Sequence, residues 1–310
     1  MFICAFILFT VRVRVIVNPT AGGSRAGRAQ PGVSDYLRKH GCRAEFVHSQ
    51  SSDHVRRLAA EGAAAGFDCI AALGGDGTFH HTVKGAFGSG AAFAFLPAGN
   101  GNDIARGLGI PGDPVDAARI LLRCAPRPVD VLRARFAGDR DELFLGVGGL
   151  GLDAETAQLV NSRFQRLPGV MRYLAAALWT LTHFDPLPVV CSADGAPEVR
   201  MPVMFAAVAN SPTYGSGLWI APAATMHDAH LDVTLVGALS WLEVLEAIPI
   251  LVRSGDIRWP AIRRLRARSV LLSATRPALF HGDGEVLGQA PVQIDCLPGA
   301  VRIHAPAPAA

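Results

Sequence analysis

The stretch that decides the fold is Cys69-Ile70-Ala71-Ala72-Leu73-Gly74-Gly75-Asp76-Gly77-Thr78. Its first five residues predict an apolar strand, which runs directly into a glycine-rich turn, and a helix is predicted from Thr78 to about Phe87. Glycine removes Cβ atoms where a backbone approaches a ligand closely, and a helix N-terminus offers N–H groups that suit phosphate. Asp76 would repel phosphate unless a cation lay between them, which indicates a nucleotide bound with Mg²⁺. The alternative is a tight strand-to-helix turn without a ligand.

Similar strand–helix units flank this stretch. Strands that alternate with helices indicate an α/β domain with a mostly parallel sheet. Two further polar, glycine-bearing loops follow strands, at Asn18–Gly23 and Leu96–Arg106, and all three loops should emerge at the carboxyl edge of the sheet, where ligands bind. Asp103 could there join Asp76 near a metal. The flanking strands are predicted at 11–17, 43–48 and 92–96, and the helices at 33–40, from Ser52 or Asp53 to about Ala65, and through Arg106.

The composition changes near residues 123–128. Beyond them, short strand-like segments separated by Gly, Pro and Asp-Gly turns predict an antiparallel β-sandwich. We therefore expect an α/β domain over 1–126 and a β-sandwich domain over 127–310, interrupted by helices at about 168–183 and 240–253. A return of the last strand or strands to the first domain stays open. The strands are predicted at 129–135, 142–147, 187–193, 200–209, 231–236, 269–274, 278–281, 291–295 and 300–304.

Composition excludes several classes of function. The net charge of +3 over 310 residues is too small to indicate a nucleic-acid partner. The two lysines, Lys39 and Lys84, do not follow glycine, so there is no Walker A loop, and Lys84 lacks the context of a protein-kinase lysine. The six cysteines form no C-x-x-C pair, which argues against a disulfide framework or zinc knuckle and fits a reducing compartment.

Three apolar or basic segments each allow two interpretations. The apolar run Phe2–Phe9 is too short to cross a membrane; it predicts a long first strand or an extension from an early start site, and a membrane-dipping N-terminus stays open. The apolar helix around Tyr173 and Trp179 is either core or membrane-facing. The basic cluster Arg263–Arg268 is either a solvated face or a site for anionic lipid headgroups.

A fourth motif, His281-Gly282-Asp283-Gly284-Glu285, lies near the C-terminus. Asp283 or Glu285 could accept a proton from an attacking hydroxyl group. The alternative for this motif is a plain Asp-Gly hairpin turn.

Together these motifs resemble the diacylglycerol kinase catalytic family, which includes sphingosine and ceramide kinases and bacterial lipid kinases. The resemblance covers about residues 12 to 304. It rests on Asn18-Pro19 with Gly22, Gly74–Thr78, Pro97–Arg106, Val129-Asp130, Gly148 to Ala154, Asn210–Gly217, Ala221–Ala224 and Asp283–Glu285.

The resemblance implies a phosphofructokinase- or NAD kinase-like α/β domain that binds ATP, and a β-sandwich domain, with the lipid hydroxyl presented between them. It assigns the general base to Asp283 or Glu285, and a network of Mg²⁺ and water to Asp76, Asp103 and Asp130. A structural Mg²⁺ would fall on Thr225, Asp228 and His230, through two backbone carbonyls and one carboxylate. The implied ATP-binding residues are Asn18, Pro19, Gly22, His48, Gly74, Gly75, Asp76, Gly77, Thr78, Phe79, His80, Gly99, Asn100 and Asn102.

Several positions depart from the family pattern. His80 and His81 stand where Asn and Glu are usual, Asn100 replaces a threonine, and Ala229 replaces a glycine. His48 stands where a threonine is expected, and Gly146 where Asn is frequent. Zinc at His80 and His81 is not expected, because adjacent residues on a helix diverge by about 100°.

The sequence thus predicts an ATP- and Mg²⁺-dependent lipid kinase, with diacylglycerol as the first acceptor to test and phosphatidic acid as its product. We expect a cytoplasmic enzyme of phospholipid biosynthesis that associates peripherally with the membrane; a homodimer stays open. The alternatives are a kinase for a sphingoid base, ceramide or NAD, and a lipid- or nucleotide-binding protein that has lost turnover. The sequence does not choose the acceptor lipid, because acyl chains are bound by generic apolar surface.

Overall fold

The computed structural model describes residues 11–151 and 185–308. They form two compact units, one of residues 11–128 with 301–308 and one of residues 129–151 with 185–300. The expected helix at 168–183 and the apolar run 2–9 lie outside the described residues. No helix in the described ranges is long and apolar enough to span a bilayer.

The first unit is built on a parallel sheet. Its strands are ordered β2-β1-β3-β4-β18, and β4 and the end of β18 pair in parallel, through Arg302 with Ala92 and Ile303 with Phe93. Every residue of β3 and β4 is buried, as expected for central strands covered on both faces. The strands are β1 (Arg12–Val17), β2 (Arg43–His48), β3 (Cys69–Gly74), β4 (Ala92–Pro97) and the end of β18 (Val292–His304).

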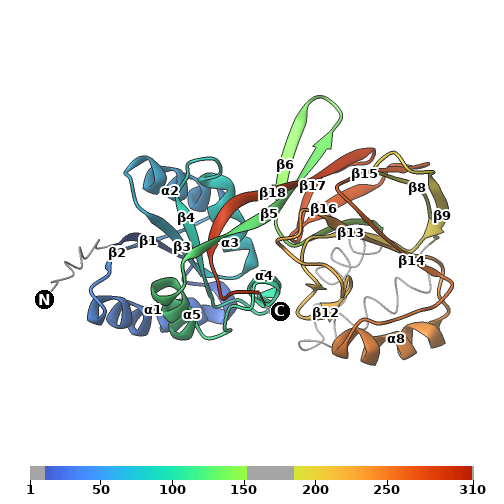
Figure 1. Ribbon diagram of the computed structural model, residues 1–310. Coiled ribbons are helices and arrows are strands. Elements are labelled where there is room, and N and C mark those ends of the chain that lie inside the picture. The colour runs from blue at the N-terminus through green and yellow to red at the C-terminus, as the bar shows by residue number, and fades with distance from the viewer. Residues whose placement is uncertain (1–10, 152–184, 309–310) are drawn as a thin grey trace, which may run out of the picture. The chain divides into compact units, whose positions relative to one another are not determined.

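Helices cover both faces of this sheet. The crossover from β1 to β2 runs opposite to those from β2 to β3 and from β3 to β4, so right-handed connections put α1 on one face and α2 with α3 on the other. Figure 1 shows α1 and α5 together on one side and α2 on the other. Ser51 caps α2 by accepting from the His54 N–H, and Asp113 caps α5. The helices are α1 (Ala21–Lys39), α2 (Ser52–Ala64), α3 (Asp76–Gly85), α4 (Asp103–Gly107) and α5 (Pro114–Arg123).

The second unit is a sandwich of two mostly antiparallel sheets. One contains β18-β15-β8-β9 with β5 and β6, and the other has the order β14-β13-β10-β7-β16-β17. Its core joins residues of both sheets, among them Leu272 and Ile294 from one and Val208, Leu235 and Phe280 from the other. The strands are β5 (Pro126–Phe136), β6 (Arg140–Phe144), β7 (Val147–Gly151), β8 (Leu187–Ala193), β9 (Val199–Val203), β10 (Phe205–Ala209), β11 (Thr213–Tyr214), β12 (Leu218–Trp219), β13 (Leu231–Val236), β14 (Ile262–Ala267), β15 (Ser269–Ala274), β16 (Leu279–Gly282) and β17 (Glu285–Gln289). In the described part of this unit the helix is α8 (Trp241–Arg253).

The chain passes between the units within two continuous strands. β5 begins in the first unit and continues into the second, and β18 leaves the second unit to end in the parallel sheet of the first. The expected fold class, a mostly parallel α/β domain followed by an antiparallel β-sandwich, is confirmed.

Candidate nucleotide site and acidic turns

Three glycine-bearing loops meet at the carboxyl ends of β1, β3 and β4. A Cβ atom on Gly22 would lie 2.0 Å from the carbonyl oxygen of Ala98, and one on Gly99 would lie 2.6 Å from Gly75 Cα. The loops therefore pack backbone against backbone, at distances that only glycine allows. This gathering was expected from the strand order, because parallel strands end on the same edge.

Asp76 ties the second loop to the third. Its carboxylate accepts hydrogen bonds from the backbone N–H groups of Asp103, at 3.1 Å, and Ile104, at 3.0 Å. These are the first amides of α4, so Asp76 caps a helix that begins 27 residues further along the chain. Asp103 itself forms an ion pair with Arg106. The spacing of the two aspartates alone could not have indicated this contact.

Asn18 and Thr78 tie the first loop to the second. The Asn18 side-chain amide donates to Thr78 Oγ1 at 3.3 Å, and the Asn18 backbone N–H donates to the Leu73 carbonyl at 3.0 Å. Thr78 is buried and folds back over its own turn, since a Cβ on Gly74 would come within 2.5 Å of Thr78 Oγ1. The start of the glycine-rich turn is thus held between Asn18 of the first loop and Thr78 of its own helix.

The first loop has an unusual backbone. Gly22, Gly23 and Ser24 lie consecutively at φ values of 59°, 64° and 68°. A left-handed serine costs about 1 kcal/mol, which marks the turn as one whose shape is held by its surroundings. The regular part of α1 begins directly after it, so amide N–H groups of a helix start lie on this loop as they do on the other two.

The remaining residues assigned to ATP separate into two groups. Asn102, at φ 55°, holds the Gly99 turn through two 3.0 Å hydrogen bonds, and Pro19, Gly77 and Asn100 lie on the same three loops. By contrast, the Phe79 ring is stacked on Phe95 in the core.

The histidines assigned to the site or next to it differ in their exposure. His80 and His81 are buried in α3. His48, at the end of β2, is exposed, and its Nε2 lies 2.8 Å from Gln30 of α1. Phe79, His80 and His81 are thus buried side chains of α3.

In the second unit, Asp283 is held by the backbone of the segment that connects β6 to β7. It lies in the turn between β16 and β17 at φ 50°, so the hairpin alternative describes the local structure correctly. Its carboxylate also accepts from the N–H groups of Leu145 at 2.7 Å and Gly146 at 2.8 Å. Two backbone donors fix the orientation of the carboxylate. Glu285 begins β17 and is half-buried.

Asp130 holds two further segments in the same way. Its two carboxylate oxygens accept from the N–H groups of Ala229 and Gly299, each at 2.7 Å. Burial, with the charges of Asp130 and Asp228, raises the pKa of the Cys296 thiol to about 12. Asp130 is thus buried near Asp228 and anchors the turn that contains it.

Asn210 links the Asp130 and Asp283 anchors and was not assigned a role from the sequence. It is fully buried, and its side-chain amide donates to the carbonyl oxygens of Asp130 at 2.9 Å and Leu145 at 2.8 Å. Leu145 is the residue whose N–H Asp283 accepts. The available signal was the position of Asn210 at the end of an apolar strand, 206–209, where a buried amide needs backbone partners.

The residues expected to hold a structural metal come together in one turn. The Asp228 carboxylate accepts from the His230 N–H at 3.0 Å and from Thr225 Oγ1 at 2.5 Å. It also accepts from the Arg266 guanidinium at 2.6 Å. The Asp228 carboxylate with the backbone carbonyls of Thr225 and His230 is an all-oxygen set of ligands that suits Mg²⁺. In the structure the Asp228 carboxylate already contacts one cation, the Arg266 guanidinium. Ala229, at φ 62°, occupies the position where glycine was expected.

Contacts within the second unit account for part of the basic cluster 263–268. Arg264 donates to the carbonyl oxygens of Gly255 and Ile257, each at 2.8 Å, and Arg266 contacts Asp228. Burial raises the pKa of Asp232, which pairs across the strands with Arg266. Two of the four arginines therefore have structural partners within the unit.

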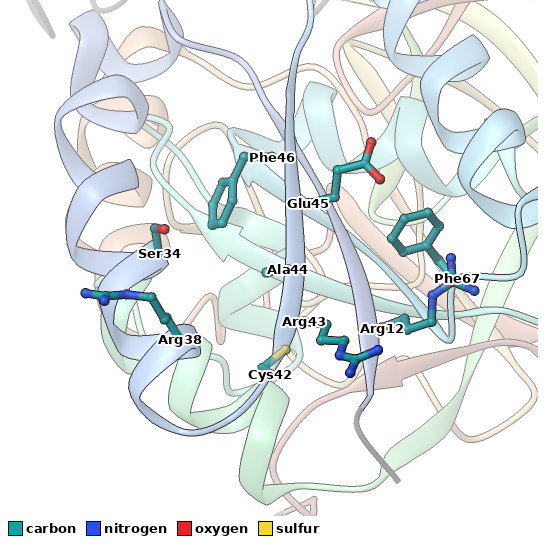
Figure 2. Close-up of a pocket in the computed structure, with 9 residues that line it drawn as sticks. All are labelled: Arg12, Ser34, Arg38, Cys42, Arg43, Ala44, Glu45, Phe46 and Phe67. Atoms are coloured by element: carbon teal, nitrogen blue, oxygen red, sulfur yellow. The ribbon is translucent and has the colours of Figure 1, made fainter.

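A separate pocket lies at the starting end of the sheet. Figure 2 shows its lining of arginines and phenylalanines around β2. The volume of the pocket is about 440 Å³. Arg12 donates to the Gly66 carbonyl at 3.2 Å and lies 4.7 Å from the centre of the Phe67 ring. Arg12 and Arg43 begin their strands, whereas the glycine loops follow strand ends, so this pocket is distinct from the three-loop site.

The fold and the site define a class of protein: an α/β unit with three glycine loops at one edge of its sheet and no Walker lysine, joined to a β-sandwich. Comparisons agree with this. Residues 12–134 match the family model of the diacylglycerol kinase catalytic domain, and residues 146–305 match that of the YegS C-terminal NAD kinase beta sandwich-like domain.

Individual proteins are similar over nearly the whole chain. A "Diacylglycerol kinase" of Mycobacterium tuberculosis is 28% identical over 300 residues, covering 95% of each chain. A "Probable lipid kinase YegS-like" of Pseudomonas aeruginosa is 30% identical over 257 residues, covering 82% of each. The crystal structure of a diacylglycerol kinase from Bacillus anthracis superposes with a TM-score of 0.73 at 21% identity, covering 96% of this chain and 97% of that one.

The chain belongs to the diacylglycerol kinase family of lipid kinases.

Proposed function

We propose that this lipid kinase transfers the γ-phosphate of ATP to the hydroxyl group of diacylglycerol, forming phosphatidic acid. The observation that carries the proposal is the interlocking of three glycine loops at the ends of β1, β3 and β4. Such loops offer backbone N–H groups at helix starts, which bind phosphate without a lysine.

In this proposal the triphosphate of Mg·ATP lies against the three loops. Gly22, Gly75 and Gly99 let the loops pack closely together, and Asp76 and Asn18 keep the loops in register. Asp103, half-buried and beside Asp76's hydrogen bonds, supplies a carboxylate toward the Mg²⁺ that accompanies ATP. The backbone amides would stabilise the charge that spreads over the transferred phosphoryl group.

Asp283 is the proposed general base. The lipid hydroxyl oxygen forms a bond to the γ-phosphorus, the bond from that phosphorus to the bridging oxygen of ADP breaks, and the hydroxyl proton passes to the Asp283 carboxylate. The hydrogen bonds from Leu145 and Gly146 hold that carboxylate in one orientation, as a base requires. Asp130 and Asn210 position the strands around it, and Glu285 is the second candidate for the base.

The turn of Thr225, Asp228 and His230 is the proposed structural Mg²⁺ site. The ion would be held by the Asp228 carboxylate and two backbone carbonyls, and it would supply positive charge that keeps the turn closed against Asp130. In the structure Arg266 contacts the same carboxylate, so an ion would compete with this arginine.

We place the enzyme in the cytoplasm, at the membrane surface during turnover. Support comes from the cysteines, since the five in the described ranges are all free, as in a reducing compartment. The acceptor lipid itself resides in a membrane, which requires at least transient contact with one.

The test is transfer of labelled γ-phosphate in mixed micelles that contain diacylglycerol, a sphingoid base or ceramide, with NAD assayed in parallel. Labelling of diacylglycerol above the other acceptors is expected. Labelling of NAD alone would overturn the lipid acceptor, and labelling of a sphingoid base or ceramide alone would replace diacylglycerol. Tight ATP binding without transfer to any acceptor would identify a binding protein that has lost turnover.

A further inference from the structure

The face of α8 that points away from its unit is apolar. Four of the nine large apolar side chains that are exposed in the described ranges lie on this one helix. Trp241, Leu242, Leu245 and Val252 have 56%, 53%, 49% and 57% of their surface exposed. The other five exposed apolar side chains belong to five different segments, and single exposed apolar residues are normal, whereas four on one helix require an explanation.

The spacing of these residues makes a continuous stripe. Leu242, Leu245, Pro249 and Val252 follow one another at intervals of three, four and three residues, so they lie on one side of the helix, with Trp241 at its beginning. The buried side chain of the helix is Ala247, on the opposite side. An ordinary surface helix has the reverse arrangement, with its apolar stripe turned inward.

The helix is a regular element and not a frayed end. Ser240 and Glu243 form a capping box: the Ser240 side chain accepts from the Glu243 N–H, and the Glu243 carboxylate accepts from the Ser240 N–H at 2.7 Å. Hydrogen bonds from the Ser240 hydroxyl and the Ser240 N–H to its carboxylate lower the pKa of Glu243. Beyond the end of the helix, Arg264 fixes the chain through the carbonyl oxygens of Gly255 and Ile257. The stripe is therefore presented on a fixed support.

We propose that the α8 stripe, formed by Trp241, Leu242, Leu245, Pro249 and Val252, docks the enzyme on a lipid bilayer by lying in its interface. Thirteen helical residues extend about 20 Å, which is too short to cross an apolar layer of about 30 Å but long enough to lie along its surface. Tryptophan with leucine and valine is the composition of interfacial helices, because the indole N–H stays at the headgroups while the rings and aliphatic groups enter the acyl region.

A second copy of the chain fits the stripe less well. The stripe is about 20 Å long and about 10 Å wide, so it could bury on the order of 200 Å² on each copy. A stable dimer needs about 800 Å² on each partner. A bilayer has no such minimum, because the apolar phase surrounds each inserted side chain.

The charges near the stripe indicate how the docking should depend on lipid charge. Glu243, Glu246 and Asp256 are offset by Arg253 and Arg258, with Arg258 paired to Asp256. This near balance predicts that docking is driven by apolar insertion and depends only weakly on salt. The inference rests on the proposed function only for the expectation that the acceptor resides in a bilayer.

The experiment is co-sedimentation of the full-length protein with phosphatidylcholine vesicles, with and without phosphatidylglycerol, in the absence of ATP and acceptor. The wild type should bind both vesicles, and the double variant Leu242→Asp/Leu245→Asp should bind about tenfold more weakly or worse. The matched control is Leu271→Asp, because Leu271 is an exposed leucine of β15 in the same unit. It should bind like the wild type, and melting curves of both variants should match that of the wild type, since the replaced side chains are exposed.

Equal vesicle binding by the double variant and the wild type would overturn the proposal, as would a wild type that binds neither vesicle. A dimer in sedimentation velocity that the double variant dissociates would assign the stripe to a second copy. Acrylamide should quench the tryptophan fluorescence of the vesicle-free wild type more strongly than that of Trp241→Phe. Equal quenching of the two proteins would show that another part of the chain covers Trp241, and this result would also overturn the proposal. Each readout is independent of phosphate transfer, so a failure here does not depend on whether the acceptor is diacylglycerol.

Discussion

Replacement of Asp76 by asparagine separates two roles that its carboxylate could have, which are anchoring the start of α4 and binding the metal. In the structure both of its oxygens accept backbone N–H groups, those of Asp103 and Ile104. Asparagine keeps one acceptor oxygen and turns an N–H₂ group toward the other amide. A hydrogen bond to a charged acceptor contributes about 1.5–3 kcal/mol, so loss of one of the two should destabilise the protein by about 2 kcal/mol.

The loss should be visible without any ligand. At about 2–4 °C for each kcal/mol in a domain of 150–250 residues, the melting temperature of the ligand-free protein should fall by roughly 4–8 °C. The ATP dissociation constant should rise about tenfold as well, because the start of α4 moves out of register with the other loops. Differential scanning calorimetry and isothermal titration measure the two effects on the same sample.

The control is Asp35→Asn on α1. Asp35 is an exposed carboxylate of the same unit that pairs with the exposed Arg38, and its loss should change stability by no more than about 0.5 kcal/mol. An Asp76→Asn protein that melts like the wild type but binds Mg·ATP poorly would refute the anchoring role. Such a result would show that the Asp76 carboxylate serves the metal alone.

Four further predictions follow from the two units. Asp283→Asn should lower kcat by about a hundredfold or more while leaving the ATP dissociation constant within about twofold, and full activity would move the base role to Glu285, to be tested with Glu285→Gln. Gly22→Ala should lower the free energy of unfolding by about 3 kcal/mol or more, because the new Cβ would meet the Ala98 carbonyl oxygen at 2.0 Å. Gly23→Ala is the control: it has a similar φ but nothing within 4 Å, so it should lower stability by about 1 kcal/mol. Equal melting temperatures for the two variants would contradict the close packing of the loops. Arg266→Gln should make the melting temperature respond more strongly to Mg²⁺ than that of the wild type, because the competing guanidinium is gone, and indifference of both proteins to Mg²⁺ and EDTA would remove the metal from this turn. Asn210→Asp should destabilise the protein by about 3 kcal/mol or more, because a charge would replace two donors in a fully buried position, and a stable variant with wild-type kcat would show that the link between Asp130 and Leu145 is dispensable.

Much of the fold could be predicted from local patterns. Strands β2, β8, β13 and β15 have the bounds that the sequence pattern predicted, and β8, β13 and β15 each bury at least one face. Several strands were not predicted, and for two of them, β14 and β17, the physical reason is clear. β14 carries three arginines whose partners, such as Gly255 and Asp228, are distant in sequence, and β17 follows the Asp-Gly turn with few buried residues.

The helix starts and the side-chain contacts of the site were less predictable. The prediction of a helix over 33–40 missed most of α1, because Gly22, Gly23 and Pro31 oppose a helix locally, while the long segment is held by its packing against β2, β3 and α5. Motif spacing indicated that the three loops would share one edge of the sheet. It did not indicate that Asp76, Asp130 and Asp283 would each accept backbone amides from another segment, because such contacts are set by tertiary packing.

The loops at the ends of β1, β3 and β4 are tested most directly by a crystal structure with Mg²⁺ and a non-hydrolysable ATP analogue. The triphosphate should contact backbone N–H groups of the loops that contain Gly22, Gly75 and Gly99. A triphosphate bound elsewhere, for example among the arginines of the pocket around β2, with the three loops empty, would contradict the proposed site.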